Sequence, residues 1–165
     1  MDKIIPNQSG MDFIADNSFH IEEADVYKSI GDGIRSVEFV RVKGDMLLFV
    51  EAKTSFPNPN NPDIDNKARF QHEIDEICEK FIHSLNLFSS VAVGVSKDSY
   101  PEDFCKPKRV SIIFLLVIRN HEFKWCIPIK KKLDAELPHY LKKIWKPAVY
   151  VINQQKAAEQ GLIVS

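Results

Sequence analysis

The stretch SVEFVRVKGDMLLFVEAKTS, residues 36–55, contains two runs of β-forming residues on either side of Gly44-Asp45. Glycine and aspartate adopt the positive φ angles that a two-residue hairpin turn requires. The stretch therefore predicts a β-hairpin, and it is the clearest such signal in the chain. The proline- and asparagine-rich residues that follow, at 56–62, predict a loop.

A two-residue turn pairs Lys43 with Met46 and thereby fixes the register of the hairpin. In that register Glu38 lies opposite Glu51, and both share one face with Lys53 because side chains alternate along a strand. Facing carboxylates repel each other by roughly a few tenths of a kcal/mol or more, and burial raises this cost. A divalent cation between them would remove the repulsion, so this face predicts a metal site.

The same residues have two other interpretations. Lys53 can bridge the two glutamates as an ordinary surface ion-pair triad without a metal. A three-residue turn would shift the register and move Glu38 to the opposite face of the hairpin.

Hydrophobic periodicity predicts a long helix after the hairpin. Apolar residues recur every three or four positions from Phe70 to Phe88, which is typical of a helix that packs one face on a sheet. We expect this helix over about 63–88, with Asp63 or Asp65 as its N-cap.

Short apolar or β-branched runs between turn signals predict further strands, at 19–30, 90–96, 110–118, 122–129 and 147–153. The strand at 110–118 is almost entirely apolar, so we expect it to be buried on both faces and to form a hairpin with 122–129. Further helices are expected at about 132–145 and 154–160, the second ended by Gly161. Residues 1–17 are expected to be irregular, with at most a short helical turn. This order predicts an α/β fold, with α+β as the alternative, in which helices cover a central mixed sheet.

Length and composition indicate one domain over residues 1–165, with 44% hydrophobic and 27% charged residues. No apolar run reaches the ~18 residues that span a bilayer, and the N-terminus lacks a signal-peptide pattern, so we expect a cytoplasmic protein without a membrane partner. The cysteines, Cys78, Cys105 and Cys126, are odd in number and far apart. That pattern favours reduced thiols over a disulfide or a zinc site.

The net charge of −1 hides an asymmetry between the two parts of the chain. Residues 1–96 hold 9 basic and 16 acidic side chains, whereas residues 97–165 hold 13 and 7. The second part contains three basic clusters, at Lys106, Lys108 and Arg109, at Lys130, Lys131 and Lys132, and at Lys142, Lys143 and Lys146. These clusters predict contacts with backbone phosphates, and Trp125 and Trp145 can stack on bases. The alternative is a solvated helix face and core tryptophans.

An acidic residue on the first strand of a hairpin, Glu-x-Lys at the end of the second, and an amphipathic helix after it resemble the PD-(D/E)XK nuclease superfamily. The motif is Glu38 followed by Glu51-Ala52-Lys53, and the resemblance covers about residues 19–96, with a basic extension over 97–165. It implies a restriction-endonuclease-like core and a nuclease that acts on DNA or RNA. Two features depart from the usual pattern. Glu38 replaces the usual aspartate, and Asp45, another acid before Glu51, falls in the turn.

The resemblance implies a role for each residue of the motif. Glu38, Glu51 and the carbonyl of Ala52 would hold Mg²⁺ or Mn²⁺, which would polarise the phosphate and activate a water. Lys53 would position that water or stabilise charge in the transition state. Possible accessory residues are Glu22, Glu23 and Gln71.

Two alternative functions remain open. The altered first acid and the missing N-terminal acid of the usual pattern favour a catalytically degraded module that binds nucleic acid or a protein without cutting. The third possibility is an unrelated interaction protein that dimerises through a sheet edge or the long helix. A chain of this size has no room for a separate recognition domain, so a cutting enzyme would be unspecific or would rely on a homodimer or another protein.

Overall fold

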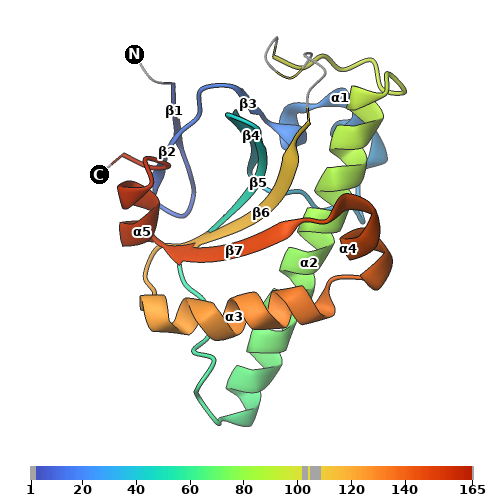
Figure 1. Ribbon diagram of the computed structural model, residues 1–165. Helices are drawn as coiled ribbons and strands as arrows, with labels where there is room; N and C mark the ends of the chain where they lie inside the picture. The colour runs from blue at the N-terminus through green and yellow to red at the C-terminus, as the bar shows by residue number, and fades with distance from the viewer. Residues whose placement is uncertain (1–2, 102–103, 105–108, 165) are drawn as a thin grey trace.

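The computed structural model describes residues 3–101, 104 and 109–164, and its centre is a five-stranded sheet (Figure 1). The order is β3-β4-β5-β6-β7, with bounds Ser18–Phe19, Phe39–Lys43, Met46–Lys53, Ser111–Ile118 and Ala148–Asn153. The first three strands are antiparallel neighbours, while β6 and β7 run parallel to β5. The predicted α/β class with a mixed sheet is confirmed.

Separate apolar cores fill the two faces of the sheet. On one face, helix α2 (Ile64–Ala92) and helix α3 (Phe123–Glu136) pack on the sheet, and Phe81 of α2 stacks on Phe114 of β6 with ring centroids 4.5 Å apart. On the other face, a small hairpin of β1 (Ile4–Pro6) and β2 (Asp12–Ile14) packs together with helix α5 (Gln154–Glu159). In Figure 1, α5 lies beside β1 and β2, on the side away from α2.

The predicted hairpin register holds along most of β4 and β5. Lys43 pairs with Met46 around a turn in which Gly44 has φ 63°, and the ladder continues to the pair of Phe39 with Val50. The ladder ends at this pair. The backbone amide of Glu38 donates to the carbonyl of Val50 at 3.0 Å, so Glu38 is out of the register that the other pairs follow. The predicted direct pairing of Glu38 with Glu51 is therefore wrong.

Side-chain alternation also breaks at Glu38. Val37 is buried in the core beneath α2, whereas Phe39 is buried in the core on the opposite face and Val40 again faces α2. Strict alternation would have put Val37 and Phe39 on the same face. Glu38 thus stands at an irregular strand entrance, at the margin of the sheet.

Helix α2 confirms the predicted long helix, and the carboxylate of Asp63 caps it by accepting from the amide of Asn66 at 3.0 Å. The helix continues to Ala92, so the predicted strand at 90–96 is wrong. Val91 is buried and extends the apolar stripe, while Val93 beyond the helix end is exposed. A short apolar run does not distinguish the last turn of a helix from a strand.

Residues 122–129 form the start of α3, so the predicted strand and hairpin there are wrong. Cys126, Ile129 and Leu133 are buried, and their spacing of three and four residues is that of a helix face despite Pro128 within the helix. The predicted helix at 132–145 is divided into the end of α3 and a separate α4 (His139–Trp145), because Pro138 disfavours helical geometry in the residue before it.

The strand predicted at 19–30 is also wrong, since only β3 is extended and the rest forms the 3₁₀ turn η1 (Ile21–Glu23) and helix α1 (Asp25–Ile30). The carboxylate of Asp98 accepts from the amides of Asp25 and Val26 at 2.7 and 2.9 Å and so caps α1. This cap comes from a distant part of the chain. The β1–β2 hairpin likewise corrects the expectation of an irregular N-terminus.

The remaining predicted elements are confirmed. β6 is buried on both faces, β7 follows α4, and α5 is followed by Gly161 with φ 66°. Cys78 and Cys126 are buried free thiols, and Cys105 lies outside the described residues. Among the described residues, no helix is long and apolar enough to cross a membrane.

Candidate active site

Glu51 lies at the carboxyl end of the middle strand, beneath helix α2, and is only 1% exposed. Strand alternation after the buried Phe49 places it on this face. Lys80 of α2 donates to Oε1 of Glu51, with a distance of 2.7 Å between nitrogen and oxygen. The second oxygen, Oε2, is buried and has no hydrogen-bond partner among the described residues. Burial raises the pKa of Glu51 to about 7, although the charge and hydrogen bond of Lys80 oppose the shift.

Lys53 also faces α2, where it forms ion pairs with Glu73 at 2.9 Å and Glu76 at 3.3 Å. Burial acts to lower the pKa of Lys53, but the hydrogen bond and the charges of these two carboxylates outweigh it and raise that pKa. Arg35 contributes a further ion pair to Glu76, at 3.1 Å. Lys53 therefore does not bridge Glu38 and Glu51, and that interpretation of the hairpin is wrong. It is a fixed positive charge at the carboxyl end of β5.

Glu38 is half-buried and accepts a hydrogen bond of 2.7 Å from the side-chain amide of Asn7, in the loop between β1 and β2. Burial raises its pKa, and the hydrogen bond from Asn7 and the charge of Lys80 oppose that shift. Repulsion between Glu38 and Glu51 raises the pKa of Glu51 further. The two predicted acids are thus close enough to interact, without standing directly opposite each other.

The three proposed accessory residues differ in how close they lie to the site. The charge of Glu22 raises the pKa of Glu38, so this acid is near the site, although it lies on a 3₁₀ turn and not on a strand. Glu23 instead lies near His20. Burial lowers the pKa of His20, and the charge of Glu23 opposes that shift. The amide of Gln71 donates to Asp75 on the exposed side of α2, at 2.8 Å, so it is turned away from the site.

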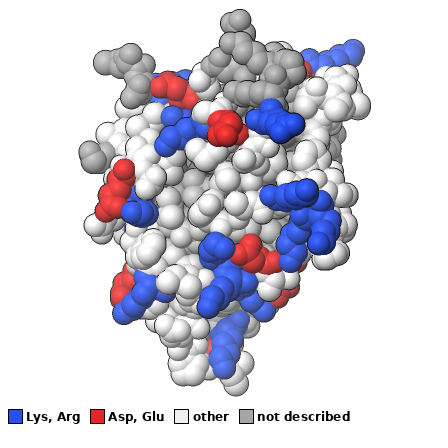
Figure 2. All heavy atoms as spheres, in the orientation of Figure 1, with Lys and Arg blue, Asp and Glu red and all other residues white. Residues whose placement is uncertain are grey.

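Two lysines of the predicted basic clusters form local ion pairs, Lys142 donates to the backbone carbonyl of Asp134, and the other described members, including Lys143 and Lys146, are exposed. Lys130 pairs with Asp134 and Lys132 with Glu136, both at 2.8 Å, while Lys131 is exposed. Arg109 is exposed, and Lys106 and Lys108 lie outside the described residues. On the face seen in Figure 1, lysine and arginine side chains surround a wide uncharged area and do not form one continuous patch (Figure 2).

Sequence reasoning missed the contribution of α2 to this site. Glu73, Glu76 and Lys80 are spaced by three and four residues, so they form one polar stripe along the helix. That spacing was visible in the sequence. It could not show which strand residues the stripe would meet, because this depends on how α2 lies across the sheet.

The donor chemistry of the site fits a hard divalent cation in one respect. Carboxylate oxygens are the ligands that Mg²⁺ and Mn²⁺ prefer, and Oε2 of Glu51 is a buried oxygen that a cation would satisfy. The ammonium of Lys80 already neutralises Oε1, and Asn7 engages Glu38. No set of three metal-ligating side chains is grouped within residues 3–101, 104 and 109–164. Any cation would therefore depend on Glu51, Glu38 and the backbone carbonyl of Ala52.

Comparisons with protein-family models, with curated proteins and with solved structures found no match to this chain.

Proposed function

We propose that this protein is a metal-dependent nuclease-like protein of the PD-(D/E)XK type, which hydrolyses phosphodiester bonds of DNA or RNA. The observation that carries the proposal is the buried carboxylate of Glu51 at the carboxyl end of β5, with Lys53 on the same face and Glu38 within electrostatic reach. The order of elements supports it: a hairpin of β4 and β5, the long helix α2, and then β6, which pairs parallel to β5.

Each side chain has a distinct part in this mechanism. Glu51, Glu38 and the carbonyl of Ala52 would hold Mg²⁺ or Mn²⁺, which when bound supplies Lewis-acid polarisation of the phosphate and a more acidic water. Glu73 and Glu76 keep Lys53 protonated and hold its ammonium beneath α2, at the carboxyl end of β5. Lys53 would therefore act by stabilising negative charge on the phosphate, and not as a proton acceptor.

A second function is favoured by one specific contact. The Lys80 ammonium sits 2.7 Å from the buried Glu51 carboxylate and can serve as its permanent counter-ion. In that case the fold would be a binding module for nucleic acid or a protein that does not cut. The two functions differ in whether a divalent cation binds at Glu51.

A Mn²⁺ titration by calorimetry tests the proposal. We expect binding in the micromolar to millimolar range by the wild-type protein and its loss in Glu51→Gln, which removes the charge and keeps the shape. The matched control is Asp75→Asn, which removes a carboxylate from the exposed side of α2 and should leave binding unchanged. Absence of Mn²⁺ binding by the wild-type protein would reject the nuclease and support the binding module.

Cleavage is tested next, on single- and double-stranded DNA and RNA. If the protein cuts, Lys53→Met should reduce the rate by about 10²-fold or more while Mn²⁺ affinity is retained, because Lys53 does not contact the cation donors. Equal loss of metal binding and cleavage in Lys53→Met would contradict the role given to this residue.

A further inference from the structure

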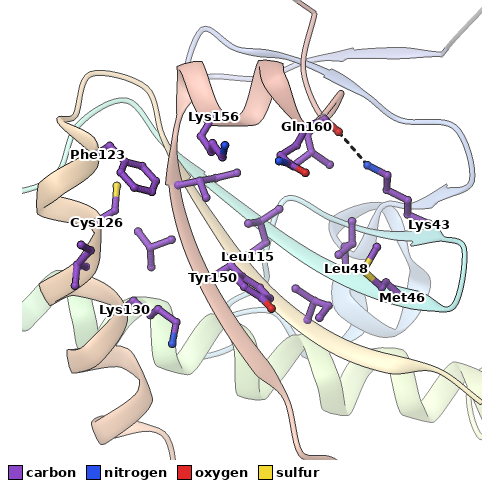
Figure 3. A pocket seen from close by; sticks show the side chains of 15 residues that line it. Lys43, Met46, Leu48, Leu115, Phe123, Cys126, Lys130, Tyr150, Lys156 and Gln160 are labelled. Carbon is purple, nitrogen blue, oxygen red and sulfur yellow. Dashed lines mark hydrogen bonds between the residues drawn. The ribbon is translucent and has the colours of Figure 1, made fainter.

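A groove of about 490 Å³ lies on the sheet face opposite to α2 and extends past the edge strand β7 to the near side of α3 (Figure 3). Leu48 of β5 and Leu115 of β6 line it, and the side chains of α3, β7 and α5 surround them (Figure 3). Its volume lies within the range of sites that bind ligands, roughly 300–1,000 Å³. None of the residues of the candidate active site lines it, so the groove is a separate feature of the molecule.

Large apolar side chains around the groove remain open to solvent. Phe123 and Ile127 of α3 and Tyr150 of β7 are each about half exposed, and all three line the groove. Single exposed apolar residues are common on protein surfaces, but a contiguous, concave set of them marks a binding site. Phenylalanine and tyrosine are also among the residues enriched in the buried parts of protein interfaces.

Three lysines from different elements line the groove together with these apolar residues: Lys43 at the end of β4, Lys130 of α3 and Lys156 of α5 (Figure 3). Lys43 donates to the backbone carbonyl of Gln160 at 3.0 Å. Lys130 and Lys156 pair with acids on their own helices, at 2.8 and 2.9 Å. Such partly exposed pairs within a helix are worth only about 0.3–0.5 kcal/mol. A ligand carboxylate can therefore replace or join them.

We propose that this groove binds an acidic amphipathic helix of a partner protein. Apolar side chains spaced by three and four residues would enter the groove, and glutamates or aspartates on the flanks of the helix would meet the three lysines. The lysines extend from three different elements that border the groove (Figure 3). An anionic amphiphile with a single headgroup would engage one of them, whereas a helix with acidic flanks can engage all three.

A second copy of this chain fits the groove less well. A symmetric contact through the groove would bring the same surface of both copies together and place lysines against lysines. Charge complementarity therefore selects an acidic partner. This inference does not depend on the proposed nuclease activity.

Fluorescence anisotropy with labelled peptides tests the proposal. The probes are a set of helical peptides with leucines on one face in different registers and glutamates on both flanks, and the same set with lysines in place of the glutamates. We expect an acidic peptide to bind, and its lysine counterpart to bind at least about tenfold more weakly. If no acidic peptide binds at up to about 1 mM, or if both charge versions bind equally, the proposal is wrong.

Variants locate the binding on the groove. Ile127→Glu should weaken the acidic peptide at least about tenfold, while the control Ile144→Glu, on α4 and 68% exposed, should leave it unchanged. Lys130→Glu should weaken the acidic peptide and strengthen the lysine peptide, and Lys143→Glu, outside the groove, should do neither. Circular dichroism confirms that each variant is folded. Equal effects of Ile127→Glu and Ile144→Glu would overturn the proposal.

Discussion

At the scale of single residues, Glu51 combines burial, a lysine on one oxygen and no hydrogen-bond partner among the described residues on the other. Its pKa of about 7 lies above the ordinary value of 4.5, because burial disfavours the charged form. The folded protein therefore holds this proton more tightly than the unfolded chain does. The contribution of this bound proton to the free energy of unfolding is fully present below about pH 4.5 and is lost as the pH rises through about 7.

This linkage gives a measurable pH dependence. The free energy of unfolding of the wild-type protein, relative to that of Glu51→Gln, should fall by on the order of 1–3 kcal/mol between pH 4.5 and pH 8. Glutamine does not titrate, so the difference between the two proteins isolates Glu51. Urea unfolding at several pH values measures it. Parallel pH profiles for the two proteins would show that the carboxyl titrates normally.

Lys80 is the counterpart of Glu51, and removing it should expose the cost of a buried carboxylate. At pH 8, Lys80→Met should destabilise the protein by roughly 3–5 kcal/mol, because Glu51 loses its ion-pair partner and must either stay charged in the core or take up a proton. At pH 5 the loss should be smaller, since Glu51 is then protonated. The exposed Lys67→Met on the same helix is the control. The double variant Lys80→Met/Glu51→Gln should recover most of the stability if the charge is the cause.

At the scale of elements, helix α1 depends on a cap supplied by another part of the chain. Asp98→Ala should remove the hydrogen bonds that its carboxylate accepts from Asp25 and Val26 and cost about 1 kcal/mol. Amide hydrogen exchange in α1 should become faster, with little change in α2. Unchanged exchange at these two amides would show that water replaces the cap without loss.

Local patterns predicted some elements well and others not at all. The hairpin around Gly44 and the long helix after Asp63 carry their turn and cap residues within their own sequence, and both were found. The start of α3 resembled a strand because EFKWCIPI is rich in apolar residues and contains a proline, and its helical spacing appears only when Leu133 is included. Elements that depend on distant contacts, such as α1, left no local signal.

The candidate site was predictable to the extent that it depends on β5. Glu51 and Lys53 share the face that alternation assigns to them, and helix α2 covers that face. The irregular entrance at Glu38 and the ion pairs with α2 depend on how separate elements pack. Sequence spacing does not contain that information.

At the scale of the whole molecule, strand β5 contributes side chains to the cores on both faces of the sheet. It is the middle strand of the sheet; Glu51 faces the candidate active site on one side, and Met46 and Leu48 line the groove on the other. Each of the two sites can therefore be altered by substitution without changing the residues that form the other.

Substitution and insertion should have very different consequences in this strand. Adding or deleting one residue near Phe49 would reverse the facing of every residue beyond it. Glu51 would then point toward the layer of Phe13 and Leu162, and an apolar neighbour would meet Lys80. Strand β5 should therefore tolerate a change of residue type at one position better than a change in its length.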